Sequence, residues 1–264
     1  MRRIVGAKAG ASQGLLPAQQ APEAAGGMAR GGRRGIAVLV LAAAAFLGIL
    51  VVAGLAAHAD MTRGPTAAQR SAAAAAAVAA RWRTWSAGRI FPAALSYDTD
   101  LLTTEDADRI GISTDVSCAS AIEPSLARLA GRDHCQAGLR AAYLDQLQGI
   151  VYTIGVLAFP DAHMAAAFSA RLPAAAGTIP LRALALPGTA SARFSADARQ
   201  ATASRHDGSF VVLTVAGYAD GEPVGAGQEA RPAIFAPAMQ LATEIMGLLI
   251  RPLTVNCHSP EWLC

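Results

Sequence analysis

Two neighbouring runs of sequence decide the fold: LRAAYLDQL at residues 139–147 and IVYTIGVLAF at residues 150–159. Gln148 and Gly149 separate them, and both runs have the length and composition of β-strands. The second run is apolar at successive positions, and a strand that is apolar on both faces lies in the centre of a sheet. The two runs therefore predict neighbouring strands inside a larger sheet.

A second pair of strand-like runs follows at residues 199–205 and 210–218. Asp207 and Gly208 stand between them, and Asp-Gly between two β-like runs is a hairpin signal because both residues accept the positive φ of a tight turn. The other expected elements are strands at 94–99 and 181–186, a short helix at 104–111, and helices at 66–86, 117–129, 160–172 and 234–249. This order predicts an α+β fold, with a mixed, mainly antiparallel sheet and helices packed on one face.

Upstream of this domain, residues 36–57 read IAVLVLAAAAFLGILVVAGLAA. About 20 apolar residues in a helix cross the hydrocarbon core of a bilayer, and a helix satisfies its own backbone groups there. The sequence therefore predicts a transmembrane helix at 35–58. The rest divides into a disordered basic tail at 1–34, an Ala-rich juxtamembrane helix or stalk at 59–89 and an extracytoplasmic α+β domain at 90–264.

Basic residues flank the predicted span on its N-terminal side. The tail carries only Glu23 against these basic residues: Arg2, Arg3, Lys8, Arg30, Arg33 and Arg34. Basic flanks favour the cytoplasmic side, so we expect a single-pass membrane protein with its N-terminus inside the cell and its C-terminal domain outside. The alternative is a secreted domain, because Ala57-His58-Ala59 is an A-x-A pattern that would permit cleavage near Ala59, before Asp60.

The net charge resides in the tail. The chain of 264 residues has 22 basic and 19 acidic side chains, and its pI of about 8.9 suggests a basic protein. Removing the six basic residues and the single acid of the tail leaves 16 basic and 18 acidic side chains. A nucleic-acid-binding domain needs a basic face on its folded part, so we expect no nucleic-acid partner.

All four cysteines, Cys118, Cys135, Cys257 and Cys264, follow the span. An even number of cysteines outside the membrane indicates two disulfides. Short loops are the least costly to close, which favours Cys118–Cys135 and Cys257–Cys264. The alternative is a metal site in which these cysteines act together with His134 and His258, although the spacing contains no C-x-x-C pair.

Several patterns that could carry chemistry are better explained without it. Gly225, Gly227 and Ala230 form a G-x-G-x-x-A pattern, but Asp220 to Pro223 separate it from the preceding strand, so we interpret it as a loop. The sequence contains neither H-E-x-x-H nor G-x-S-x-G, and the histidines are scattered. We expect no cofactor and assign no catalytic residue.

Acidic residues gather near the first predicted strand: Asp98, Asp100, Glu105, Asp106 and Asp108. A calcium loop requires acids at fixed spacing around a glycine, and no glycine lies among these residues. We interpret them as acids of a solvated loop and of a helix N-terminus.

The best candidate for a binding groove is a set of polar residues on the two central strands: Arg140, Tyr143, Asp145 and Tyr152. The leading hypothesis is a binding or accessory protein of the cell envelope that contacts a partner protein or a cell-wall ligand, through the sheet or the loop at 221–228. One alternative is an envelope hydrolase that uses Asp98, Asp100 and Asp145. Another is a tethered sensor whose tail binds a cytoplasmic partner.

Four segments resemble an actinobacterial kind of extracytoplasmic domain: CQAGLRAAYLDQ at 135–146, VYTIGVLAFPDAHMAAAF at 151–168, LPGTASARF at 186–194 and FVVLTVAGYADG at 210–221. Such chains have one N-terminal span and a cysteine-stapled α+β domain of unassigned function. The sensor domains of some actinobacterial receptor kinases are similar in layout. The resemblance implies a fold and a location, and it brings no catalytic motif.

Overall fold

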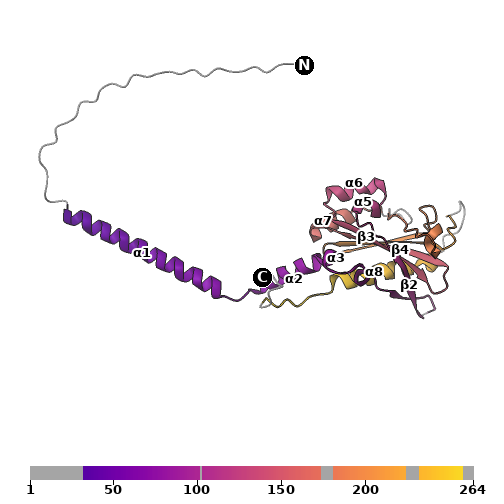
Figure 1. The fold of residues 1–264 in the computed structure, drawn as a ribbon, viewed down its shortest axis with the longest axis horizontal. Coiled ribbons are helices and arrows are strands. Elements are labelled where there is room, and N and C mark those ends of the chain that lie inside the picture. Colours follow the sequence, from indigo (N-terminus) through magenta and orange to yellow (C-terminus); the bar gives the residue numbers. More distant parts are fainter. Residues whose placement is uncertain (1–31, 102, 174–180, 224–231, 258–264) are drawn as a thin grey trace, which may run out of the picture. The chain divides into compact units, whose positions relative to one another are not determined.

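The computed structural model of the chain describes residues 32–101, 103–173, 181–223 and 232–257. The chain forms two compact units, Met1–Gly64 and Pro65–Cys264 (Figure 1). The predicted basic tail lies almost wholly outside the described residues, and the first helix already begins at Gly32.

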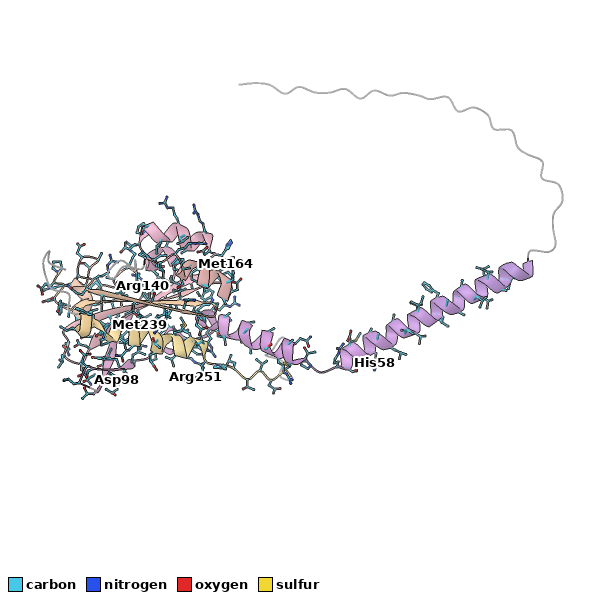
Figure 2. All side chains as sticks on the ribbon, turned by 180° about the vertical axis from the view of Figure 1, so that it is seen from behind. His58, Asp98, Arg140, Met164, Met239 and Arg251 are labelled. Carbon is cyan, nitrogen blue, oxygen red and sulfur yellow. A yellow bond between two sulfur atoms is a disulfide. The ribbon has the colours of Figure 1, made fainter. Side chains whose placement is uncertain are left out.

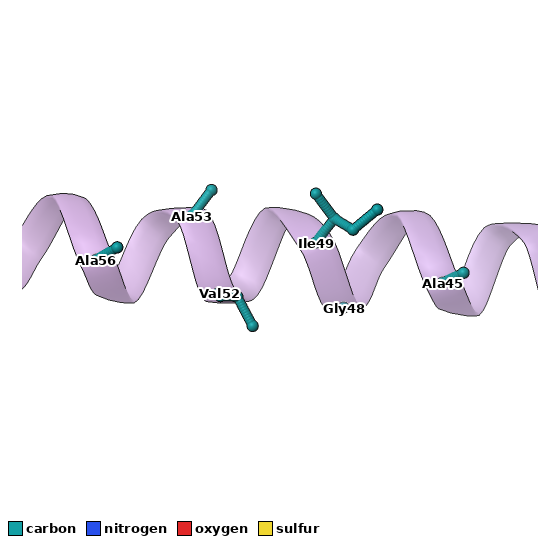
Figure 3. Close-up of a pocket in the computed structure, with 6 residues that line it drawn as sticks. All are labelled: Ala45, Gly48, Ile49, Val52, Ala53 and Ala56. Carbon is teal, nitrogen blue, oxygen red and sulfur yellow. The ribbon is translucent and has the colours of Figure 1, made fainter.

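The described part of the first unit consists of α1 (Gly32–Thr62) and the residues that follow it. Its segment Ile36–Thr62 has 27 residues and a mean hydropathy of 3.0, and its apolar window is 0% buried. A helix of this length and composition can cross a membrane, which confirms the predicted apolar helix. Figure 3 shows residues that line a shallow apolar hollow on its surface: Ala45, Gly48, Ile49, Val52, Ala53 and Ala56.

The second unit is built on a sheet that has six strands within the described residues. They are β1 (Ala94–Asp98), β2 (Thr104–Ile112), β3 (Ala137–Asp145), β4 (Ile150–Ala158), β5 (Ala201–Asp207) and β6 (Phe210–Tyr218). Their order is β1-β2-β3-β4-β6-β5, and every neighbouring pair is antiparallel. The sheet is thus wholly antiparallel in this part of the chain, rather than mixed.

Both predicted strand pairs are hairpins. β3 and β4 pair from Ala137 with Ala158 to Leu144 with Val151. β5 and β6 meet at the Asp-Gly turn, where Gly208 has a φ of 51° in the left-handed region that glycine adopts without strain. These elements are confirmed because their signals, apolar strands and turn residues, are local in the sequence.

The predicted short helix at 104–111 is wrong, because these residues form β2. β2 pairs with β1 on one side and with β3 on the other, with a register shift between Arg109 and Gly111. Its acids suggested a helix N-terminus, but ladder bonds to two neighbouring strands outweigh a weak local preference.

The prediction of helices on one face of the sheet is also wrong. α8 (Pro237–Ile250) packs on one face, which we call the α8 face. α5 (Cys118–Ala121), α6 (Pro124–Arg132) and α7 (Ala162–Ser169) lie over the opposite one, the α7 face (Figure 1). Met164 of α7 and Met239 of α8 mark the two sides in Figure 2. The physical reason is burial: every residue of β3 is buried, so both faces of the central strands need a cover.

Two more predicted elements, a helix and a strand, differ in the structure on the α7 face. The predicted helix at 117–129 is broken between α5 and α6, where Pro124 begins the second helix. At the break, Ile122 forms an isolated bridge with Leu181. Apart from that bridge, residues 181–186 do not pair with another strand, so the predicted strand there is wrong. The segment crosses over the sheet, and its backbone bonds to the side chains of Arg140 and Thr153.

A disulfide joins Cys118 to Cys135 across 17 positions, with a Cα–Cα distance of 6.3 Å, as predicted. It is the only disulfide between described residues, because the second predicted pair ends at Cys264, which lies outside them. A Cβ added at Gly138 would lie 2.7 Å from the Ala121 Cβ atom, so α5 packs tightly on β3 beside the disulfide. Because Cys118 and Cys135 are bonded to each other, the alternative metal site that used either thiolate is wrong.

The Ala-rich segment is not one continuous helix within the second unit. It forms α2 (Ala67–Ala79), α3 (Arg81–Thr84) and α4 (Ala87–Ile90), and the capping box of Thr66 and Gln69 begins it. Arg81 is 2% exposed, and its guanidinium donates to the carbonyls of Leu248, Leu249 and Arg251 at the end of α8. A cation at the end of a helix satisfies free carbonyls and the helix dipole, so Arg81 ties this segment to α8.

Candidate functional site

The four residues of the predicted groove do not share one face of the sheet. Side chains alternate along a strand, so Tyr143 and Asp145 lie on the α8 face together with Tyr152 of β4. Arg140 lies on the α7 face, between β3 and the segment that crosses over it. The structure therefore separates Arg140 from the other three residues.

Arg140 holds the crossing segment of the α7 face. Its side chain is 8% exposed, and its Nη1 donates to the carbonyl of Arg182 at 3.2 Å. Beside it, the Thr153 hydroxyl accepts the backbone N–H of Leu184 at 2.9 Å. Burial lowers the pKa of Arg140, and the charge of Arg182 lowers it further. These contacts give Arg140 a structural role.

Tyr143 is also a structural residue. It is 0% exposed, and its hydroxyl donates to the carbonyl of Pro92 at 2.9 Å. Burial raises the pKa of this hydroxyl far above its usual range. The bond anchors the segment that leads into β1.

The remaining two groove residues belong to a group that we call the tyrosine–carboxylate cluster: Tyr97, Glu105, Asp145 and Tyr152. The rings of Tyr97 and Tyr152 lie 6.4 Å apart between centroids, with an interplanar angle of 56°. The Tyr97 hydroxyl donates to Glu105 Oε2 at 3.0 Å. Asp145 Oδ1 accepts the backbone N–H groups of Gly149 and Ile150, both at 2.7 Å. Four strands, β1 to β4, thus contribute one side chain each.

The cluster is mostly buried and carries unbalanced negative charge. Tyr97, Tyr152 and Asp145 are 5%, 1% and 7% exposed, whereas Glu105 is half-buried. The ion pairs between described residues are Arg63–Asp60, Arg171–Asp133 and Arg199–Glu123, and none includes Glu105 or Asp145. The two carboxylates therefore have no cationic partner in the described part of the chain.

The hydroxyl of Tyr152 differs from those of Tyr97 and Tyr143 on the α8 face. Tyr97 and Tyr143 each donate a hydrogen bond, but no described residue bonds to the Tyr152 hydroxyl. Burial raises the pKa of Tyr152, and the neighbouring Tyr97, Asp145 and Glu105 raise it further. Burial and Glu105 raise the pKa of Tyr97 in the same way. Both phenols are neutral over the physiological pH range.

The other acids near β1 do not join this group. Asp98 accepts a bond from Thr104, and Asp106 accepts one from Ser96, on the other face of the β1–β2 hairpin. Asp100 and Asp108 are exposed. Asp98 and Asp145 thus lie on opposite faces and do not form a catalytic pair.

The histidines are dispersed in the structure as well. His206 Nδ1 lies 3.1 Å from the Ser169 hydroxyl at the surface, which joins β5 to α7. Among the described residues no carboxylate bonds to His206, and no group of three His, Cys, Asp or Glu side chains is placed to hold a metal ion. His258 and the glycines at 225 and 227 lie outside the described residues.

Sequence reasoning identified Tyr152 and Asp145 but missed Tyr97 and Glu105. Tyr97 lies two positions after Leu95 in a predicted strand, so both side chains point to the same face. This spacing was the signal in the sequence that Tyr97 is buried. The sequence predicts a helix at Glu105, and this prediction hides its place beside Tyr97 in the β1–β2 register.

The structure defines the class of the chain: an apolar helix followed by a disulfide-stapled antiparallel α+β domain. Comparisons with protein-family models, with curated proteins and with solved structures give no match to it. Its function is therefore inferred from the fold and from the tyrosine–carboxylate cluster.

Proposed function

We propose that the chain is a single-pass membrane-anchored binding protein of the cell envelope, with its N-terminus in the cytoplasm and its α+β domain outside. The apolar length of α1 supports the anchor, and the basic residues before it support the orientation. The Cys118–Cys135 disulfide supports an oxidising compartment for the domain. The helix continues through Ala57 to Ala59, which supports a retained anchor over a cleaved signal.

The observation that carries a binding role is the tyrosine–carboxylate cluster. In this cluster Asp145 and Tyr152 are 7% and 1% exposed. Neither Asp145 nor Glu105 forms an ion pair with a described residue, and no described residue hydrogen-bonds to the Tyr152 hydroxyl. Two carboxylates without a cationic partner, beside buried phenols, form a candidate binding site. A hydrolase that used Asp98, Asp100 and Asp145 is disfavoured because Asp98 and Asp145 lie on opposite faces of the sheet.

The orientation is tested with an alkaline phosphatase reporter fused after residue 264. The reporter folds only after export, because its disulfides need an oxidising compartment. We expect activity with the full chain and none when residues 36–57 are deleted. An inactive reporter on the full chain, at equal abundance, would contradict the proposed orientation.

Binding and hydrolysis are separated by incubating the detergent-solubilised full chain with purified cell wall. We expect the chain to sediment with the wall and to release no soluble fragments. Fragments that disappear in an Asp145→Ala variant would support the hydrolase instead. A chain that stays in the supernatant would contradict a cell-wall ligand.

A further inference from the structure

We infer that the tyrosine–carboxylate cluster binds a primary ammonium group. This inference rests on the proposed binding role and names the chemical class of ligand that the site accepts. The juxtaposition that carries it is Glu105 of β2, Asp145 of β3 and Tyr152 of β4, which lie on the α8 face of three neighbouring strands. The Tyr97 hydroxyl donates to Glu105, the rings of Tyr97 and Tyr152 lie 6.4 Å apart, and neither carboxylate forms an ion pair with a described residue.

The charge of the site selects a cation. Asp145 is 7% exposed, and a buried carboxylate is costly unless a cation or hydrogen bonds compensate for its lost hydration. Two backbone N–H groups reach its Oδ1 atom, and no basic side chain is paired with it in the described chain. Arg109, the basic residue of β2 on this face, donates to the carbonyl of Phe91 instead.

The hydrogen-bonding groups match an ammonium. The Tyr97 proton is already donated to Glu105, whereas the Tyr152 oxygen is free among the described residues to accept a bond. A primary ammonium has three donors and no acceptor. The carboxylates of Glu105 and Asp145 and the hydroxyl of Tyr152 supply one acceptor for each donor.

The aromatic rings add to this selection. Tyr97 and Tyr152 lie 6.4 Å apart at 56°, and aromatic faces attract cations through their quadrupole. A calcium ion requires six or more oxygen ligands, about 2.3–2.6 Å away. No set of three potential metal-ligating residues is found in the described chain, so the site fits an organic cation better than a divalent metal. The half-buried Glu105 provides the side from which such a group approaches.

The probe is n-butylammonium chloride, titrated into the detergent-solubilised full chain by calorimetry at constant ionic strength. Its neutral isostere, n-butanol, and calcium chloride are titrated in parallel. We expect saturable binding of n-butylammonium alone. Equal binding of n-butanol would show an apolar site, and calcium binding that displaces the amine would show a metal site; either result would overturn the inference.

Three variants locate the binding. Glu105→Gln and Asp145→Asn remove a charge but keep an oxygen acceptor, and each should weaken n-butylammonium by about tenfold, as expected for a lost charge-assisted hydrogen bond. Tyr152→Phe removes only the hydroxyl and should weaken it by about fivefold. Asp108→Asn is the matched control, because Asp108 is an exposed acid on the other face of β2 and should leave the affinity unchanged.

The outcomes separate this inference from the proposed function. Thermal unfolding of each variant without ligand shows whether the variant is folded. If Glu105→Gln or Asp145→Asn does not fold, Tyr152→Phe still tests the site, because it removes only a hydroxyl. Amine binding that Asp108→Asn weakens as much as Asp145→Asn would overturn the assignment of the site. A chain that is exported and sediments with the cell wall but does not bind the amine would refute the ammonium site alone. Amine binding by a chain that is not exported would refute the envelope role alone.

Discussion

The two faces of the sheet use buried polar side chains in different ways. On the α7 face, Arg140 and Thr153 bond to the backbone of the segment that crosses over them. On the α8 face, the buried Thr214 hydroxyl has no described hydrogen-bond partner, and no described residue hydrogen-bonds to the Tyr152 hydroxyl. On the α7 face, the Nε atom of Arg140 is also unpaired among the described residues, but its Nη1 atom is bonded. Buried polar side chains therefore hold a crossing segment on the first face, whereas two hydroxyls on the second face hold no other described segment.

The largest effect is expected on the α7 face at Gly217. A Cβ there would lie 2.1 Å from the Ala198 carbonyl oxygen and 2.6 Å from the Phe194 ring, so the backbone of β6 or of the loop at Ala198 would have to shift. Gly217→Ala should cost about 3 kcal/mol or more, or prevent folding. The measurement is urea unfolding of the detergent-solubilised chain, followed by near-ultraviolet circular dichroism.

Gly247→Ala is its control, because an added Cβ at Gly247 in α8 meets no atom within 4 Å. Alanine also has the higher helix propensity, so this variant should be stabilised by about 0.5–1 kcal/mol. A tolerated Gly217→Ala would show that the α7 face has room for a methyl group at this position.

The next largest effect is expected from the disulfide beside α5. Replacing Cys118 and Cys135 by serine removes a closure of 17 positions. Loop-closure entropy predicts a loss of about 3 kcal/mol in the free energy of unfolding. The urea midpoint of the wild-type chain should fall on reduction much more than that of the double variant; equal shifts in both would assign the effect to other cysteines.

A matched threonine pair tests the comparison directly. Thr153 and Thr214 are both 0% exposed, but only Thr153 has a described partner, the N–H of Leu184. Thr153→Val leaves that N–H unpaired and should cost about 1–2 kcal/mol. Thr214→Val removes a buried hydroxyl without a described partner and should be neutral or stabilising. Equal costs in urea unfolding would contradict the distinction between the faces.

The smallest effect is expected within the α8 face itself. Tyr143→Phe removes the bond to the Pro92 carbonyl and should cost about 1 kcal/mol. Tyr152→Phe removes no described bond, so its stability should stay within about 0.5 kcal/mol of the wild type. If Tyr152→Phe were the more destabilising of the two, its hydroxyl would be structural and unavailable to a ligand.

The parts of the site differ in how far the sequence could reveal them. Asp145 and Tyr152 belong to one hairpin, whose turn and apolar pattern are visible in the sequence, and both were selected as groove residues. Tyr97 and Glu105 come from the β1–β2 hairpin, which joins them through the pairing of β2 with β3. That pairing has no local signal, and the acids of β2 suggested a helix.

The sequence by itself determined the apolar helix, the β3–β4 and β5–β6 hairpins, the closing helix and the Cys118–Cys135 pair. Each depends on apolar periodicity, turn residues or a short loop, which are properties of adjacent residues. The tertiary structure alone decided the strand order, the helices on both faces and the gathering of the tyrosine–carboxylate cluster. These features depend on which distant surfaces bury one another, and that choice is made by packing of the whole domain.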